Sequence, residues 1–153
     1  MQQLEPRVRL VWGLGVLVGA LVVGGVFTAI LQFLTDRPIW PGLAVGGVVL
    51  IVGLTHAILC YRIWRFEVQD DALYLERGVL TRVRTVVPYV RVQHIDTQRN
   101  PIERVFGLGR VVVYTAGSRG ADVAIPGLTP DRASDLQHRL RALVGESDAE
   151  DAV

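Results

Sequence analysis

The side chains that most often carry covalent chemistry are scarce in this chain. It has three Ser, three His and one Cys, and none of them falls at the spacing of a known nucleophile, general base or metal site. Gly107-Leu108-Gly109 lacks the rest of a dinucleotide-binding loop, and His94 and His138 are expected on a strand face and a helix surface. The sequence therefore predicts no enzyme, with no catalytic residue, metal, cofactor or small-molecule substrate.

The basic residues of the chain are all of one type. All sixteen are Arg and none is Lys, so each stays charged at any relevant pH, but no function follows from that alone. The formal net charge is only +1, and there are no aromatic pairs of the kind that stack on single strands. Nucleic acid is therefore not an expected partner, and the position of each Arg depends on the elements that carry it.

Two uninterrupted apolar stretches, residues 10–34 and 39–61, dominate the first part of the chain. Neither contains a charge, and each is long enough to cross the roughly 30 Å hydrocarbon core of a bilayer as a helix. Four residues, Thr35 to Pro38, separate them, which makes the helices antiparallel neighbours. Residues 1–61 are therefore predicted to form a transmembrane hairpin rather than to include a cleaved signal peptide.

Arginines at the helix ends predict how the hairpin is oriented. Arg7 and Arg9 precede the first helix and Arg62 and Arg65 follow the second, whereas the loop has only Arg37 beside Asp36. Because positive residues favour the cytoplasmic side, we expect both termini in the cytoplasm and the hairpin in the plasma membrane. Tyr61 and Trp64 are predicted to anchor the second helix at the membrane interface.

Small residues recur on one face of each predicted helix. They are Gly15 and Gly19 in the first helix and Gly42, Gly46 and Gly53 in the second. Such residues let helix backbones approach closely, so we expect mutual packing of the two helices, with a dimer interface as the alternative. No Asp, Glu, Lys or Arg lies at membrane depth, which argues against transport by this chain alone.

From Trp64 onward the pattern changes to short runs typical of β-strands. Trp64, Phe66 and Val68 alternate with polar residues, as in a half-buried strand. The six runs are residues 64–69, 72–77, 81–87, 91–98, 110–115 and 122–125, and turn signals separate them, among them Asn100-Pro101 and Gly117 to Gly120. Residues 62–145 are therefore predicted to form one cytoplasmic domain.

The last predicted element is an amphipathic helix. Thr129 is expected as its N-cap, Pro130 as its first residue and Gly145 as its C-cap, with an apolar stripe that includes Leu136 and Leu140. Residues 146–153 are strongly acidic and are predicted to form a disordered tail. Six or seven antiparallel strands closed by such a helix match the outline of a pleckstrin-homology (PH)-like split barrel.

Several segments, in order, resemble the membrane-flanked bacterial PH domains of YdbS-like proteins. They are the two-helix lead-in, Tyr61-Arg62-Ile63-Trp64-Arg65-Phe66, Arg77-Gly78-Val79-Leu80, Val87-Pro88-Tyr89-Val90-Arg91-Val92-Gln93-His94-Ile95, Phe106-Gly107-Leu108-Gly109-Arg110-Val111 and Tyr114-Thr115-Ala116-Gly117. The resemblance implies a split barrel with a capping helix, a membrane location and no known catalysis. It also implies homo-oligomerisation.

Counting hairpins from the second helix predicts which turns face the membrane. The first strand leaves the bilayer, so the turn around residues 77–82 and the segment 99–108 should return to it. This places Arg62, Arg65, Arg77, Arg82, Arg99 and Arg104 near the cytoplasmic leaflet, and lets Val79 and Leu80 insert between headgroups. Alternatively, these Arg residues form a solvated strand face that pairs with Glu76 and Glu103.

Two functions from different classes follow. The first, which is favoured because the sequence shows no specific lipid pocket, is a non-enzymatic interaction or scaffold module, tethered to the bilayer, that self-associates or docks a membrane or envelope-related partner protein. The second is a sensor of anionic lipid that uses the membrane-proximal Arg residues. A specific inositol-phosphate site is not expected, because the first hairpin carries Gln69-Asp70-Asp71 in place of basic residues.

Overall fold

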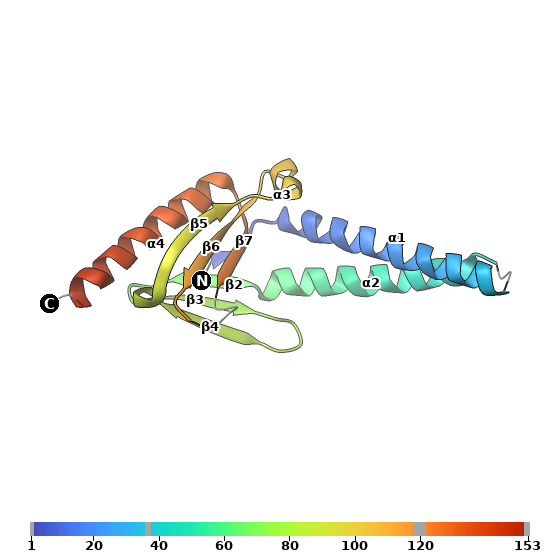
Figure 1. Ribbon diagram of the computed structural model, residues 1–153, viewed down its shortest axis with the longest axis horizontal. Helices are drawn as coiled ribbons and strands as arrows, with labels where there is room; N and C mark the ends of the chain where they lie inside the picture. The colour runs from blue at the N-terminus through green and yellow to red at the C-terminus, as the bar shows by residue number, and fades with distance from the viewer. Residues whose placement is uncertain (1, 36–37, 118–121, 152–153) are drawn as a thin grey trace. The chain divides into compact units, whose positions relative to one another are not determined.

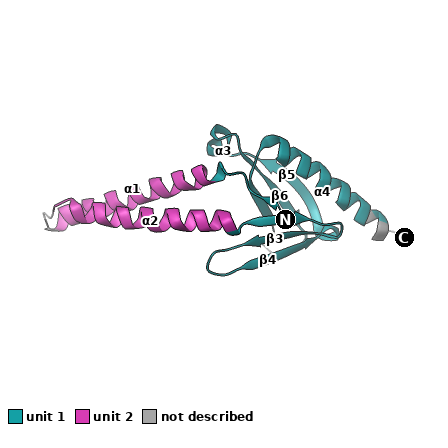
Figure 2. Ribbon diagram, turned by 180° about the vertical axis from the view of Figure 1, so that it is seen from behind, with its two compact units in different colours: residues 1–8, 63–153 teal, residues 9–62 magenta. Residues whose placement is uncertain are grey.

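The computed structural model describes residues 2–35, 38–117 and 122–151. It comprises two compact units: unit 1 contains residues 1–8 and 63–153, and unit 2 contains residues 9–62 (Figure 2). Residues 1–8 were assigned to the hairpin from the sequence, but they belong with the β-strands instead. Asp36 and Arg37 of the connecting loop, and residues 118–120 of the predicted turn, lie outside the described residues.

Two long helices make up nearly all of unit 2. They are α1 (Val8–Thr35) and α2 (Trp40–Ile63), close to the stretches predicted from the sequence. Most of their large apolar side chains are exposed, which is costly in water and favourable in lipid. By length and composition, both helices are candidate membrane spans.

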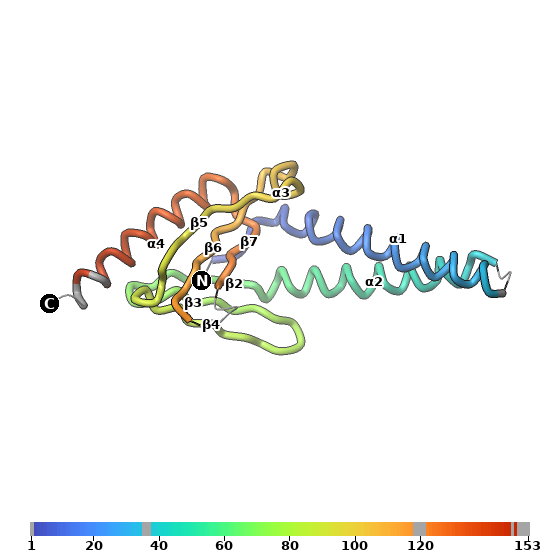
Figure 3. The backbone as a smooth tube through the Cα atoms, in the orientation of Figure 1, coloured from blue at the N-terminus to red at the C-terminus, as the bar shows by residue number. Residues whose placement is uncertain are grey.

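Unit 1 contains a four-stranded antiparallel sheet in the order β1-β2-β3-β4 (Figure 1). Its strands are β1 (Gln2–Gln3), β2 (Arg65–Val68), β3 (Ala72–Arg77) and β4 (Val83–Pro88). Figure 3 shows β3 and β4 as one long hairpin. The alternation seen in the sequence places Phe66, Leu73 and Leu75 on the buried face of this sheet.

A second antiparallel sheet has three strands in the order β5-β6-β7. Its strands are β5 (Val92–Gln98), β6 (Gly109–Thr115) and β7 (Val123–Leu128). A short 3-10 helix, η1 (Tyr89–Arg91), leads into β5, and the five-residue helix α3 (Pro101–Val105) connects β5 to β6. Val111, Val113 and Ile125 of this sheet are fully buried, so the core of unit 1 lies between the two sheets and the last helix.

The last helix, α4 (Pro130–Asp151), covers the second sheet. The Thr129 hydroxyl accepts a hydrogen bond from the Arg132 amide at 3.4 Å, in keeping with its predicted N-cap role. Ala133, Leu136 and Leu140 are buried on the sheet side. The helix continues through Gly145 to Asp151, so the predicted end at Gly145 is wrong, and residues 146–151 are helical rather than disordered.

The predicted architecture of a helical hairpin, antiparallel β-strands and a C-terminal helix is confirmed. The sheets are not closed into a barrel, because no strand pairing joins the four-stranded and three-stranded sheets within the described residues. The two-residue strand β1 was not predicted. It pairs Gln3 with Arg65 and Gln2 with Phe66, at one edge of the first sheet.

Candidate functional site

Strand register brings three of the predicted Arg residues to one end of unit 1. Arg65 begins β2 and is paired across the sheet with Glu76, so the start of β2 lies beside the end of β3. Arg77 ends β3 and is paired with Val83, so the turn that contains Arg82 extends from the same end. Val79 and Leu80 form the middle of this turn, and Leu80 is 96% exposed.

The remaining two predicted Arg residues of unit 1 lie around α3. Arg99 precedes the helix, Arg104 lies within it, and both are exposed. The N-terminal segment connects this region to the first sheet: Gln3 pairs with Arg65, and the Glu5 amide donates to the Gly127 carbonyl at 2.8 Å. A methyl group added to Gly107, just after α3, would lie 3.7 Å from Nη1 of Arg7.

Together these segments form a common end of unit 1, which we call the tether end and define as residues 65, 77–82 and 99–108. In Figure 1 the β3–β4 turn and α3 both lie at this end of unit 1. The chain leaves unit 1 after Val8 and returns to it at Ile63, next to these segments in sequence and in strand pairing. The opposite end of unit 1 carries the acidic turn at Asp70 and Asp71 and the helix η1.

The Arg side chains of the tether end are largely free for an external ligand. Those of Arg65, Arg77, Arg82 and Arg104 form neither an ion pair nor a hydrogen bond within the described part of the chain. Arg99 Nε donates to the Leu108 carbonyl at 3.2 Å. The carboxylates considered as alternative partners are engaged elsewhere, Glu76 with Arg84 at 2.5 Å and Glu103 with Arg110 at 2.6 Å.

The predicted interface anchors make contacts within the protein. Tyr61 lies at the end of α2, and the Arg9 guanidinium stacks over its ring at 3.9 Å from the ring centre. Trp64 is buried and packs edge-on against Phe66, with the ring centres 6.2 Å apart. Arg62 is exposed in the last turn of α2, where a cation complements the helix dipole.

Sequence reasoning did not identify α3, which carries two exposed aliphatic side chains at the tether end. Val105 is 83% exposed and Ile102 is 48% exposed. The Asn100-Pro101 pair was interpreted as a turn. The capping-box pattern of Asn100 with Glu103, and Pro101 at the first helical position, were the signals that would have predicted a helix here.

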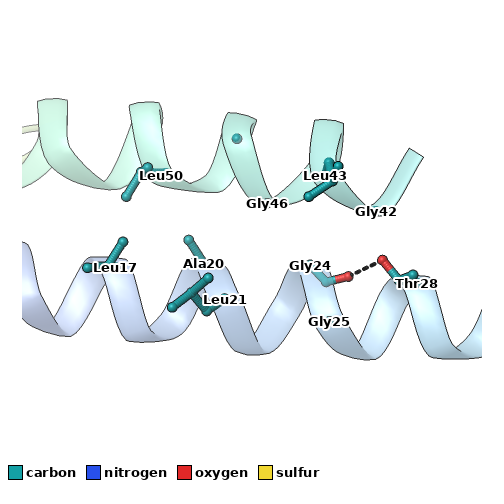
Figure 4. A pocket seen from close by; sticks show the side chains of 11 residues that line it. Leu17, Ala20, Leu21, Gly24, Gly25, Thr28, Gly42, Leu43, Gly46 and Leu50 are labelled. Carbon is teal, nitrogen blue, oxygen red and sulfur yellow. Dashed lines mark hydrogen bonds between the residues drawn. The ribbon is translucent and has the colours of Figure 1, made fainter. Parts of the chain in front are cut away.

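Within unit 2, only part of the predicted glycine contact is formed between α1 and α2. Gly42 and Gly46 approach Gly24 and Thr28 of α1, and Gly53 lies against Val16. A groove of about 330 Å³ runs along this contact, and the Thr28 hydroxyl donates to the Gly24 carbonyl at 2.8 Å (Figure 4). A Cβ added at Gly15 or Gly19 would meet no heavy atom within 4 Å, so these two glycines do not form the close backbone contact between the helices, and their role in packing stays a prediction.

The register of the two helices explains this difference. Ala20, Gly24 and Thr28 recur every four residues and form the face of α1 that meets α2. Gly15 and Gly19 also repeat at four residues, but they lie about 100° around the helix from Val16 and Ala20. Both stripes satisfy the same small-residue spacing, so the sequence alone did not distinguish them.

The remaining polar groups of the helices form no recognisable catalytic or metal site. Cys60 Sγ lies 3.7 Å from the His56 ring nitrogens, one helical turn away. In the part of the chain that the structure describes, no three His, Cys, Asp or Glu side chains are grouped so that they would hold a metal ion. The arrangement that stands out is therefore the basic and aliphatic tether end.

Comparison with known proteins agrees with this architecture. The chain is 27% identical over 124 residues to the UPF0699 transmembrane protein YdbS of Bacillus subtilis (strain 168), which covers 78% of this chain and 76% of that protein. No solved structure gives a significant match. The sequence profile of the bacterial PH domain matches residues 12–144, which include most of α1, all of α2 and all but one of the strands. The protein is therefore a member of the bacterial PH domain family.

Proposed function

We propose that this protein is a non-enzymatic, membrane-anchored module that senses anionic lipid at the cytoplasmic leaflet of the plasma membrane. The observation that carries the proposal is the grouping of Arg65, Arg77, Arg82, Arg99 and Arg104 at the end of unit 1 that is joined covalently to the membrane helices. The helices supply the tether, and the Arg side chains supply the contact with lipid phosphates.

Electrostatics supports a lipid ligand in preference to internal ion pairing. Each Arg near an anionic bilayer surface gains about 1 kcal/mol, and four or five such residues act together because one rigid unit carries them. A domain already tethered to the membrane loses little further translational entropy when it binds lipid, so weak individual contacts are sufficient for binding. We expect the interaction to weaken with salt, because exposed charges are screened beyond about 10 Å at 0.1 M ionic strength.

Hydrogen exchange of the full chain in lipid nanodiscs tests the proposal. Adding phosphatidylglycerol to phosphatidylcholine should slow amide exchange in residues 78–82 and 99–108. The fourfold variant Arg77→Gln, Arg82→Gln, Arg99→Gln, Arg104→Gln should lose this effect. The matched control, Arg84→Gln, Arg91→Gln, Arg139→Gln, Arg141→Gln, removes the same charge elsewhere and should retain it. An equal response of the two variants would contradict the proposal.

A second candidate function is docking of another protein, either a second copy of this chain or a partner membrane protein. It is favoured by β4, the outer strand of the first sheet, which has no strand neighbour beyond it in the described residues. Its Val83 and Val86 are exposed, and an exposed apolar edge strand is a template for pairing with a further strand.

Crosslinking with mass spectrometry in native membranes distinguishes this second function. Val86→Lys places a charge on the edge strand and should abolish crosslinks to a partner or second copy. Val90→Lys changes an exposed valine outside the strand and should not. Crosslinks that persist in both variants would show that association does not use this edge.

A further inference from the structure

The tether end carries aliphatic side chains as well as arginines, and they come from two distant segments. Leu80 is at the tip of the β3–β4 turn, and Ile102 and Val105 are on α3. Leu80 is 96% exposed, Val105 83% and Ile102 48%. Exposed aliphatic side chains are common singly, but here both protruding segments of one end carry them beside unpaired arginines.

The helix α3 has the reverse polarity of an ordinary surface helix. Its one buried residue is Glu103, whereas Ile102 and Val105 face outward. A surface helix in water normally buries its apolar side chains and exposes its charges. An outward aliphatic face is favourable where the surroundings are themselves apolar.

The buried carboxylate holds α3 in this orientation. Glu103 accepts hydrogen bonds from the Asn100 amide at 3.0 Å and from Arg110 Nη2 at 2.6 Å, while the Asn100 side chain accepts from the Glu103 amide at 2.8 Å. The Leu108 amide then donates to the Glu103 carbonyl at 2.7 Å, after Gly107 in the left-handed region at φ 65°. The cap at Asn100 before the helix and the turn at Gly107 after it thus hold Ile102 and Val105 in their exposed positions.

The conformation of the β3–β4 turn is likewise determined by its sequence. Gly78 has φ 99°, and a side chain there would collide with the Thr81 carbonyl oxygen, so the conformation that projects Leu80 requires glycine. Arg77 and Arg82 flank this turn, and Arg104 lies between Ile102 and Val105 in α3. In both segments, aliphatic side chains are presented next to guanidinium groups.

We propose that Leu80, Ile102 and Val105 form a two-part wedge that inserts into the headgroup and upper acyl region of the anionic leaflet. The inference rests on the proposed lipid-sensing function and adds hydrophobic insertion to it. Its occupant is the bilayer, because the arginines beside the wedge complement lipid phosphates and because the chain passes from this end directly into two membrane helices.

Site-specific fluorescence in the full chain tests the wedge. Cys60 is the single cysteine, so a Cys60→Ser background permits Leu80→Cys and Val105→Cys to be labelled with an environment-sensitive nitrobenzoxadiazole dye. Val90→Cys is the matched control, because Val90 is also an exposed aliphatic residue but lies in η1 at the opposite end of unit 1. The labelled chains are placed in nanodiscs of phosphatidylcholine and phosphatidylglycerol.

Insertion predicts blue-shifted emission and severalfold stronger quenching by shallow spin-labelled lipid for the dyes at positions 80 and 105 than for the dye at 90. Equal, water-like emission at all three positions would overturn the wedge. If phosphatidylglycerol still slowed hydrogen exchange in that case, the arginines would contact lipid without insertion of the aliphatic side chains. Dyes that are shielded in native membranes but water-exposed in nanodiscs would also overturn it, in favour of a protein partner.

Discussion

At the scale of single residues, a buried ion pair and an exposed ion pair of unit 1 should contribute very differently to its stability. Glu103 is only 4% exposed, and its carboxylate binds Arg110 and caps α3, whereas the pair of Glu76 and Arg84 lies on the outer face of a sheet. A buried charge left without its partner is costly, but an exposed pair contributes little. The two glutamates therefore provide a matched comparison.

Replacing Glu103 with Gln should weaken unit 1 more than replacing Glu76. We expect Glu103→Gln to lower the free energy of unfolding by about 1.5–3 kcal/mol, the range for hydrogen bonds to charged groups, and Glu76→Gln by less than about 1 kcal/mol. Urea unfolding of the full chain in detergent measures the difference, and local hydrogen exchange should show the loss around residues 99–110. Equal effects of the two substitutions would mean that Glu103 does not anchor α3.

Tyr89, at the end of unit 1 opposite the tether end, should make the stability of unit 1 decrease at alkaline pH. Burial raises the pKa of Tyr89 to about 12 from an ordinary value of 10.0, and its hydroxyl donates to the Gln69 carbonyl at 2.7 Å. Between these pH values the unfolded chain loses a proton that the folded chain keeps, so stability should fall as pH rises above 10.

The phenylalanine variant isolates this effect. Tyr89→Phe should lose about 1 kcal/mol of stability at neutral pH, because it leaves the Gln69 carbonyl without its donor, and should show a smaller further loss between pH 10 and 12. Denaturant titrations at several pH values measure both quantities. Tyr74→Phe keeps the Tyr89 phenol and should retain the full alkaline slope.

At the scale of elements, the packing of α1 against α2 depends on which glycines face each other. A methyl group on Gly42 would collide with the side chain of Thr28, whereas one on Gly15 would meet no neighbour within 4 Å. In a lipid environment close backbone approach supplies much of the helix association energy, because there is no hydrophobic driving force between the helices.

Gly42→Ala should therefore destabilise the helix pair, and Gly15→Ala should not. Overpacking a tight contact costs about 1–3 kcal/mol. Titration of the chain from mixed micelles with sodium dodecyl sulfate, followed by tryptophan emission, to which Trp12 and Trp40 of the helices and Trp64 of unit 1 contribute, measures the change. A loss of stability in Gly15→Ala that matches the loss in Gly42→Ala would point to a role for Gly15 in contacts beyond this helix pair.

The sequence predicted those elements whose signal is carried by many residues. Hydropathy located both helices to within two residues, and alternation located six strands, because these patterns report burial directly. Gln2-Gln3 is too short to show any period, so β1 was missed. Gly145 was interpreted as a cap, but none of the positive-φ glycines is Gly145, and the residues after it include no proline to stop the helix.

The same reasoning applies to the tether end. Strand counting grouped its arginines because each hairpin reverses the chain, and the observed register agrees for residues 65, 77 and 82. It did not predict the outward face of α3, since a buried glutamate with exposed valine and isoleucine inverts the usual pattern. That polarity depends on the Arg110 partner, seven residues along the chain and in another element.

At the scale of the whole molecule, the proposed function requires one orientation across the bilayer. The loop at Pro38 should be outside the cell, and the turn at Asp70 should be in the cytoplasm. In a Cys60→Ser chain, a membrane-impermeant maleimide should label Pro38→Cys in intact cells and label Asp70→Cys only after permeabilisation. The reverse labelling pattern would place unit 1 outside the cell and would contradict the proposed contact with the cytoplasmic leaflet.

The short strand β1 also constrains how unit 1 assembles. Gln2 and Gln3 precede both apolar helices in the chain, whereas their partner β2 follows them, so this pairing can form only after both helices have been synthesised. Glu5 pairs with Arg132 of α4 at 2.6 Å, so this segment also requires α4 before its contacts are complete. Residues 2–5 therefore join parts of unit 1 that are far apart in the sequence, and unit 1 is complete only once α4 has been synthesised.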